Sequence, residues 1–266
     1  MDKRIYLCLA HMSGKEQGFI KEAFDTNWVV PLGPNVNAFE EELESFIGNN
    51  KKVVALSAGT AAIHLALIQL GIQAGDEVIC QSFTFCASAN PVTYLGAVPV
   101  FVDSEKDTWN MSPVLLEEAI KDRIAKTGRN PKAIIPVHLY GMPAKIDEIL
   151  KIAEKYDIPV LEDAAEALGS EFEGRKCGTF GKFGALSFNG NKMITTSGGG
   201  ALIVADDEMR KKTMFYATQA REMFPYYQHY HETHMFQNFL PDLPMHMRWI
   251  LLSYVLDKCP AFPVSS

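Results

Sequence analysis

From residue 52 onward the sequence alternates short apolar runs with stretches of helical length, and this alternation restricts the fold more than any other feature. The expected strands are Val53–Ser57, Glu77–Cys80, Val98–Val102, Ala133–Val137, Pro159–Glu162 and Ala185–Phe188. The expected helices are Ala61–Leu70, Phe85–Leu95, Pro113–Lys126 and Ala144–Tyr156, preceded by helical patterning over residues 12–48 around a break at Pro31–Asn35. Continuous apolar strands separated by helices predict an α/β fold with a mainly parallel sheet covered on both faces.

Composition excludes several classes of protein. A chain of 266 residues, 47% of them hydrophobic, has room for one large domain, or for one domain and a fragment of a second. A net charge of -7 leaves no basic patch, so we expect no nucleic-acid partner. No apolar run approaches the roughly 20 residues that span a membrane. The five cysteines are widely spaced without a C-x-x-C pair, so we expect buried free thiols in a soluble cytoplasmic protein.

Candidate binding residues follow the expected strands, where ligands of parallel sheets bind. After the first strand, Ser57–Ala62 is a turn of small residues that opens a helix. Gly59 lets the backbone approach an anion, and the free N–H groups of the helix start, with Thr60 beside them, supply donors. The alternative is that Thr60 is an ordinary N-cap.

Two further residues stand at strand ends. Phe85 follows the second strand and could lie flat on an aromatic ligand, although an aromatic residue there could equally be part of the core. Asp163 ends the fifth strand, and a buried carboxylate is costly unless a positive group lies against it. A protonated ring nitrogen would supply this positive charge, and so would a structural lysine or arginine.

The stretch Gly184–Gly200 supplies the most reactive candidate. Its apolar run leads to Ser187, Asn189 and Lys192, and three glycines follow. A lysine in apolar surroundings can lose its proton, and a neutral amine forms an imine with an aldehyde. The alternative is a solvated surface lysine.

Together the strand-end residues describe a single ligand, pyridoxal 5′-phosphate. They supply a partner for its phosphate, its flat ring, its ring nitrogen and its aldehyde.

At this point the sequence resembles a known family. The motifs are Pro31–Pro34, Ser57–Ala66, Gln81–Phe85, Asp107–Met111, Glu162–Glu166 and Ser187–Gly200, in family order over about residues 5–232. They resemble those of the DegT/DnrJ/EryC1/StrS sugar aminotransferases, which are fold-type-I pyridoxal-phosphate enzymes. The resemblance implies a three-layer large domain.

The resemblance also implies roles for individual residues. Lys192 is expected to be the Schiff-base lysine and proton shuttle, and Asp163 the partner of the pyridine nitrogen. Glu166 stands where the family places a polar contact near the ring hydroxyl, and Phe85 resembles the ring-stacking aromatic. The phosphate-binding positions of the family correspond to Gly59, Thr60 and Ser187. Asn189 resembles a residue that contacts cofactor or substrate.

The activity that the resemblance implies is a transamination. L-glutamate gives its amino group to the cofactor, and a nucleotide-linked keto-sugar then receives it, for amino sugars of exopolysaccharide, capsule or glycans. The family also implies a homodimer. A sugar dehydratase on the same fold is disfavoured because those relatives carry histidine where Lys192 stands, and an oxidoreductase is disfavoured because no G-x-G-x-x-G follows the first strand.

The last part of the sequence departs from the family. We expect residues 1–233 to form the large domain with its N-terminal helical segment, and residues 234–266 to be an aberrant tail, from a frame change or truncation, in place of the small C-terminal domain. The alternative function is therefore an inactive fragment or an interaction partner of an intact subunit. His229, His231 and His234 could bind zinc by spacing, but a polar loop is favoured and no metal is expected.

Overall fold

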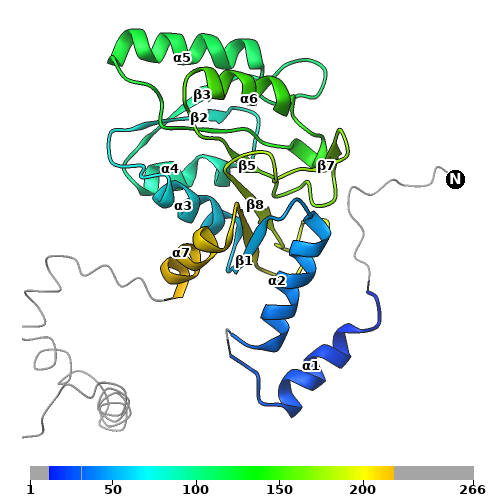
Figure 1. Ribbon diagram of the computed structural model, residues 1–266. Helices are drawn as coiled ribbons and strands as arrows, with labels where there is room; N and C mark the ends of the chain where they lie inside the picture. Colours follow the sequence, from blue (N-terminus) through cyan, green and yellow to red (C-terminus); the bar gives the residue numbers. More distant parts are fainter. Residues whose placement is uncertain (1–11, 31, 219–266) are drawn as a thin grey trace, which may run out of the picture. The chain divides into compact units, whose positions relative to one another are not determined.

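The computed structural model describes residues 12–30 and 32–218 (Figure 1). The helices in this part of the chain are α1 (Glu16–Asp25), α2 (Pro34–Ile47), α3 (Gly59–Gln69), η1 (Cys86–Ser88), α4 (Asn90–Tyr94), α5 (Pro113–Thr127), η2 (Leu139–Gly141), α6 (Ile146–Lys155) and α7 (Asp207–Thr218). The strands are β1 (Lys52–Leu56), β2 (Glu77–Gln81), β3 (Val98–Val102), β4 (Ala133–Ile135), β5 (Leu161–Asp163), β6 (Glu171–Phe172), β7 (Arg175–Lys176), β8 (Phe183–Ser187) and β9 (Gly200–Val204).

The strands form a mainly parallel sheet, as predicted. One group has the order β3-β2-β4 and the other β1-β9-β8-β5, and parallel bridges at Ile134–Val160 and Val137–Asp163 join β4 to β5. Within this sheet β9 runs antiparallel to its neighbours, β1 and β8, and outside it β6 and β7 form a separate antiparallel pair. The carboxyl ends of β2, β4, β5 and β8 therefore lie along the same edge of the sheet.

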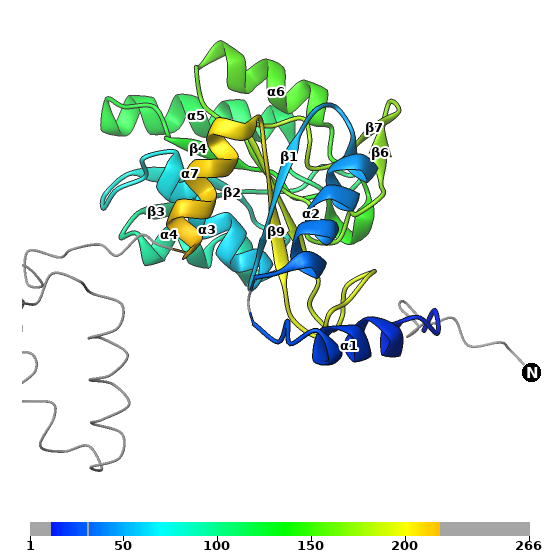
Figure 2. The same ribbon diagram turned by 60° about the horizontal axis from the view of Figure 1, so that its bottom comes forward.

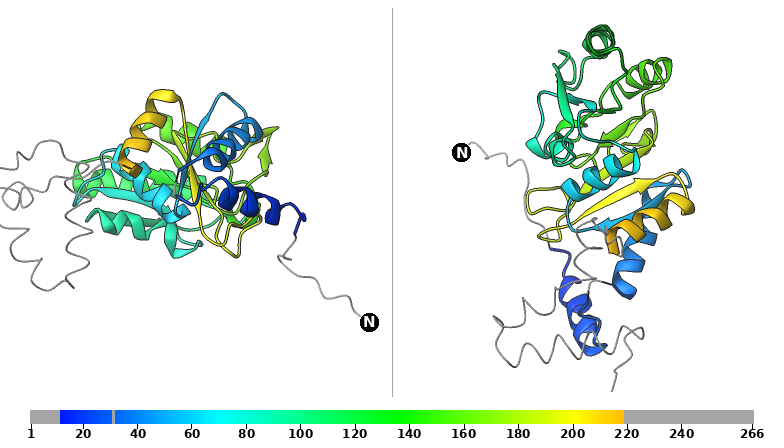
Figure 3. Two further views of the ribbon diagram at one scale, coloured as in Figure 1. Left: turned by 90° about the horizontal axis from the view of Figure 1, so that it is seen from below. Right: turned by 90° about the vertical axis from the view of Figure 1, so that its left-hand side faces the viewer.

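Helices cover both faces of the sheet because successive strand residues point to opposite sides. Val78 and Cys80 pack in one cluster with residues of α3 and α4, and Met209 of α7 packs against it. Ile79 between them points the other way, into a cluster with α5 and α6, while α2 covers β1, β8 and β9 on that face. Figure 2 shows α2 and α7 on either side of β9, and Figure 3 shows α5 and α6 side by side. This is the expected three-layer arrangement.

Some expected boundaries differ from the structure. The helix expected over Phe85–Leu95 is a 3₁₀ turn followed by the short α4, with Pro91 near its start. The break expected at Pro31–Asn35 begins and ends earlier in the structure, since α1 ends at Asp25 and α2 already begins at Pro34, where a proline near the helix N-terminus sacrifices no hydrogen bond. The domain boundary expected at residue 233, and the tail 234–266, lie outside the described residues.

Close backbone approaches in the sheet require glycine. A Cβ built at Gly184 would lie 2.0 Å from the carbonyl oxygen of Gly178, and one at Gly200 would lie 2.2 Å from the carbonyl carbon of Ala58. These contacts are far inside van der Waals distance. The glycines therefore allow β8 to approach the 178 turn and β9 to approach the start of α3.

We predict that Gly184→Ala lowers the free energy of unfolding by about 1–3 kcal/mol or more, because the added methyl meets backbone that cannot move aside. Urea unfolding of the purified protein measures the effect. Gly190→Ala is the control, since a Cβ at that position meets nothing within 4 Å, and its effect should stay within about 0.5 kcal/mol. Equal effects of the two substitutions would contradict the close approach.

Candidate active site

The carboxyl edge of the sheet brings several predicted residues together around Lys192. The Lys192 side chain is only 9% exposed, and its Nζ lies 3.1 Å from Glu166 Oε1 in an ion pair. The other carboxylate oxygen of Glu166 accepts a hydrogen bond of 3.0 Å from the Tyr140 N–H. Lys192 Nζ also lies 6.0 Å from the ring centroid of Phe85. Lys192 is thus a sheltered, ion-paired lysine, and the alternative of a solvated surface lysine is wrong.

Asp163 ends β5 with its carboxylate buried. One oxygen accepts a hydrogen bond of 2.5 Å from the Ser88 hydroxyl, and the other accepts one of 3.1 Å from the Ala165 N–H. Burial raises the pKa of Asp163 above its ordinary value of 3.8, while these two donors and the positive charge of Lys192 hold the pKa down. An anion held in this way favours a positive group placed beside it.

The start of α3 meets the end of β8. The N-cap is Ala58, without a side-chain cap, so the alternative of Thr60 as N-cap is wrong. Because the first helical hydrogen bond runs from the Ala62 N–H to Ala58 (3.1 Å), the preceding N–H groups, those of Gly59 and Thr60 among them, face outward at the helix N-terminus. A Cβ at Gly59 would lie 2.9 Å from Cβ of Ser187 and 3.3 Å from its hydroxyl oxygen. Gly59, Thr60 and Ser187 therefore form a cradle suited to an anion.

Two further predicted site residues, Phe85 and Asn189, are exposed at the surface. Phe85 is 69% exposed, so it is not part of the core, and its ring is available to a flat ligand. Asn189 is exposed and its side-chain amide donates to Asn191 Oδ1 at 3.4 Å, while its carbonyl accepts from the Lys192 N–H at 2.9 Å. Asn189 thus shapes the lysine loop through its backbone, and its side-chain amide is directed to Asn191.

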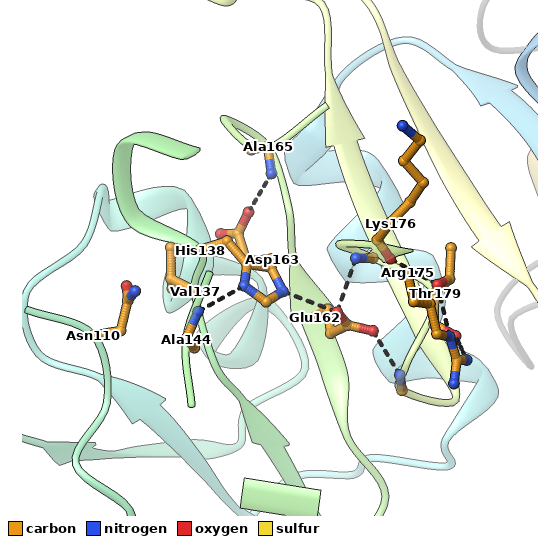
Figure 4. A network of polar contacts seen from close by, with 12 residues as sticks. Asn110, Val137, His138, Ala144, Glu162, Asp163, Ala165, Arg175, Lys176 and Thr179 are labelled. Carbon is orange, nitrogen blue, oxygen red and sulfur yellow. Dashed lines mark hydrogen bonds and ion pairs between the residues drawn. The ribbon is translucent and has the colours of Figure 1, made fainter. Parts of the chain in front are cut away.

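A buried network lies behind Asp163 (Figure 4). The Ala144 N–H donates to His138 Nδ1 at 3.0 Å, so His138 donates its own proton from Nε2 to Glu162 Oε2 at 2.8 Å. Glu162 also accepts from the N–H groups of Gly178 (2.8 Å) and Gly181 (2.5 Å). His138 is fully buried and hydrogen-bonded through both ring nitrogens. The network fixes β5 and hence the backbone that carries Asp163.

Gln81 and Asn110 form a further buried set of hydrogen bonds, here called the amide brace, which was not predicted from the sequence. Gln81 donates to the Phe83 carbonyl at 2.8 Å and accepts from the Met111 N–H at 2.8 Å. Asn110 accepts from the Leu139 N–H at 3.0 Å and donates to the Met142 carbonyl at 2.9 Å. The brace ties together the segments that follow β2, β3 and β4. Polar residues at a strand end and within the Asp107–Met111 motif were its only sequence indication.

The brace also supports unusual backbone. Tyr140 has a φ of 51°, in the left-handed region that bulky residues rarely adopt. The neighbouring N–H of Leu139 is held by Asn110, and the Tyr140 N–H itself is held by Glu166. Such conformations persist where surrounding contacts fix them, and they gather at functional sites.

Other predicted features have mixed outcomes. Cys80 and Cys177 are buried free thiols as expected, and burial raises the pKa of the Cys80 thiol to about 12, but Cys86 is exposed, against expectation. Among the described residues no cluster of His, Cys, Asp and Glu could hold a metal ion, and no helix is both long and apolar enough to cross a membrane. The histidines at 229, 231 and 234, and two of the cysteines, lie outside the described residues.

Comparison with known proteins identifies the family. Residues 11–243 match the model of the DegT/DnrJ/EryC1/StrS aminotransferase family. The chain belongs to this family.

Relatives and solved structures agree with the family match. The chain is 54% identical over 229 residues to the "Putative pyridoxal phosphate-dependent aminotransferase EpsN" of Bacillus subtilis, covering 86% of this chain and 58% of that protein. It is 42% identical to the GDP-perosamine synthase of Caulobacter vibrioides, over 73% of this chain and 50% of that protein. A DegT/DnrJ/EryC1/StrS aminotransferase structure from Brucella abortus superimposes with a TM-score of 0.69 at 36% identity. The match covers 77% of this chain and 58% of that one. The chain thus spans between half and three-fifths of the length of these relatives.

The raised pKa of Asp163 predicts a pH dependence of stability. A carboxyl with a higher pKa in the folded than in the unfolded state loses folded-state stability as pH rises above its ordinary value of 3.8. In cofactor-free protein, Asp163→Asn should therefore raise the Tm relative to the parent at pH 7, and the difference should shrink toward pH 4. Asp147→Asn, on the exposed face of α6, is the control. A difference that stays constant between pH 4 and pH 7 would contradict a buried, ionised Asp163.

The brace predicts a cost for removing its amide. Asn110→Ala leaves the Leu139 N–H without its acceptor, and we expect a loss of about 1–3 kcal/mol in the free energy of unfolding. Asn130→Ala removes a side-chain amide that donates to the Tyr156 carbonyl at an exposed position, and should cost no more than about 0.5 kcal/mol. Urea unfolding of both variants makes the comparison. Similar losses of unfolding free energy in the two variants would show that the Asn110 side chain does not stabilise these segments.

Proposed function

We propose that this chain is a pyridoxal 5′-phosphate-dependent aminotransferase that transfers the amino group of L-glutamate to a nucleotide-linked keto-sugar. The observation that carries the proposal is the sheltered Lys192, ion-paired to Glu166 and within 6.0 Å of the Phe85 ring centroid. Family membership and the names of the relatives support it.

The residues present fit the cofactor. The start of α3, where Gly59 leaves no room for a Cβ, offers N–H groups to a phosphate, with Ser187 beside them. The exposed face of Phe85 offers a surface for a flat ring. The buried carboxylate of Asp163, held by two donors, offers an acceptor to a protonated ring nitrogen. Phosphate, ring and ring nitrogen would each have a partner of matching chemistry.

In this proposal Lys192 does the proton chemistry. When bound, pyridoxal 5′-phosphate supplies an aldehyde that condenses with amines and a ring that withdraws electrons from the reacting carbon. The Lys192 amine would hold the aldehyde at rest and, once the substrate amine replaces it, move a proton to and from the reacting carbon. Glu166 would keep the Lys192 side chain in place, and Asp163 would keep the ring nitrogen protonated. Asn189 would hold the turn from which Lys192 projects.

The name of one group of relatives supports the proposed acceptor. GDP-perosamine synthase is named for an amino sugar linked to a nucleotide, which supports a nucleotide-linked keto-sugar as the acceptor. A role in the synthesis of exopolysaccharide, capsule or glycans follows from such a product. The buried free thiols Cys80 and Cys177 support a cytoplasmic location.

A homodimer completes the proposal. Helix α1 has no buried residue, although its sequence and the segment after it are rich in large apolar side chains. The exposed ones are Phe19, Ile20, Phe24, Trp28, Val29, Val30 and Leu32. Apolar surface gathered in one short segment is typical of an interaction site. We propose that a second copy of the chain covers it.

The first test is the absorbance spectrum of the purified chain after incubation with pyridoxal 5′-phosphate and removal of unbound cofactor. We expect a visible band from lysine-bound cofactor that Lys192→Ala abolishes and L-glutamate bleaches. Lys182→Ala, a change at an exposed lysine near β8, should leave the band in place. A folded protein that shows no band would contradict the proposed function.

The second test addresses the dimer. Sedimentation equilibrium should give twice the mass of the chain for the parent protein. Phe24→Glu places a charge in the proposed contact and should shift the protein to monomer, whereas Gln17→Glu on the same helix should not. A monomeric parent at micromolar concentration would rule out this part of the proposal.

A further inference from the structure

Ser88 forms a hydrogen bond directly with Asp163, and no sequence motif predicted this contact. Its side chain is fully buried, and its hydroxyl oxygen lies 2.5 Å from Asp163 Oδ2. The two residues are 75 positions apart in sequence. In the sheet, β4 lies between the strands that lead to them, β2 and β5. This hydrogen bond therefore crosses the sheet edge and joins two segments whose strands are not neighbours.

The direction of the hydrogen bonds follows from the available protons. Thr84 Oγ1 lies 2.8 Å from Ser88 Oγ. A serine hydroxyl has one proton, and an ionised carboxylate only accepts. Ser88 therefore donates to Asp163 and accepts from Thr84, which gives a chain of donors from Thr84 through Ser88 to the carboxylate. Each donor in such a chain strengthens the next.

The same two residues flank Phe85. The Ser88 N–H donates to the Phe85 carbonyl at 3.1 Å, so Phe85 starts the turn that Ser88 ends. Phe85 is 69% exposed, so it has little side-chain packing to fix its position. The hydroxyls of Thr84 and Ser88 thus hold the turn that presents this ring.

We propose that Ser88 is a positioning residue: its hydroxyl orients the Asp163 carboxylate and ties it to the turn that carries Phe85. The ring-nitrogen partner and the ring-stacking side chain of the proposed cofactor site are then set by one buried hydroxyl. The consequence for the cofactor rests on the proposed function, whereas the coupling between Ser88 and Asp163 does not.

The decisive test is a double-mutant cycle with Ser88→Ala and Asp163→Asn in cofactor-free full-length chain, followed by thermal unfolding from pH 4 to pH 8. Removing the Ser88 donor takes away an interaction that favours the charged carboxylate, so in the parent background Ser88→Ala should lower the Tm more as pH rises. In the Asp163→Asn background the effect of Ser88→Ala should not change with pH.

A second measurement follows cofactor binding. The Kd for pyridoxal 5′-phosphate, from absorbance titration, should rise about tenfold in Ser88→Ala, the change expected for loss of a hydrogen bond to a charged group. Ser82→Ala is the matched control, since it removes an exposed hydroxyl from the same segment after β2, one that donates to Asp103 Oδ1 at 3.1 Å. Its Kd should stay within about threefold of the parent.

The outcomes separate this inference from the proposed function. An effect of Ser88→Ala that is the same at every pH and in both backgrounds would overturn the positioning role, because a packing loss alone has that signature. A parent protein that binds no cofactor would overturn the proposed function, while the pH cycle in cofactor-free protein would still decide the coupling.

Discussion

The buried carboxylate of Asp163 sets the conditions that the rest of the site must meet. Taking an ionised carboxylate out of water costs several kcal/mol unless donors and positive charge surround it. Here the Ser88 hydroxyl and the Ala165 N–H supply the donors, and Lys192 supplies positive charge. These partners come from the turn after β2, from the end of β5 and from the loop after β8, so the charge is tolerated only when the whole sheet edge is assembled.

Small residues and buried amides make that assembly possible. Gly59 and Gly200 let the start of α3 approach β8 and β9 to distances that any Cβ would prevent. Gln81 and Asn110 fix the segments after β2, β3 and β4, and Glu162 with His138 fixes β5 from behind. These contacts fix the end of β5, which carries Asp163 and which Glu166 follows in the chain. Function here depends on backbone positions that are set well away from the reacting atoms.

Much of this was predictable from the sequence, and the exceptions have physical reasons. Apolar runs and helical spacing give most helices and six of the nine described strands, all except β6, β7 and β9. The rule that parallel strands end at one edge brings Lys192, Asp163 and Phe85 together. The antiparallel direction of β9 was not predictable, since Gly200–Val204 is an apolar run like the others. The role of Ser88 was not predictable either, because a serine between two alanines has no distinguishing pattern, and its partner lies 75 residues away. Asn189 has a favourable sequence position, yet its side chain turns to Asn191.

The most direct test of the account locates the reactive lysine by chemistry. The full chain would be incubated with pyridoxal 5′-phosphate, treated with borohydride to lock the cofactor onto the amine that holds it, digested, and mapped by mass spectrometry. We expect a single dominant adduct on the peptide that contains Lys192, at one cofactor per chain. Adducts spread over exposed lysines such as Lys182 and Lys151, with Lys192 unmodified, would contradict it.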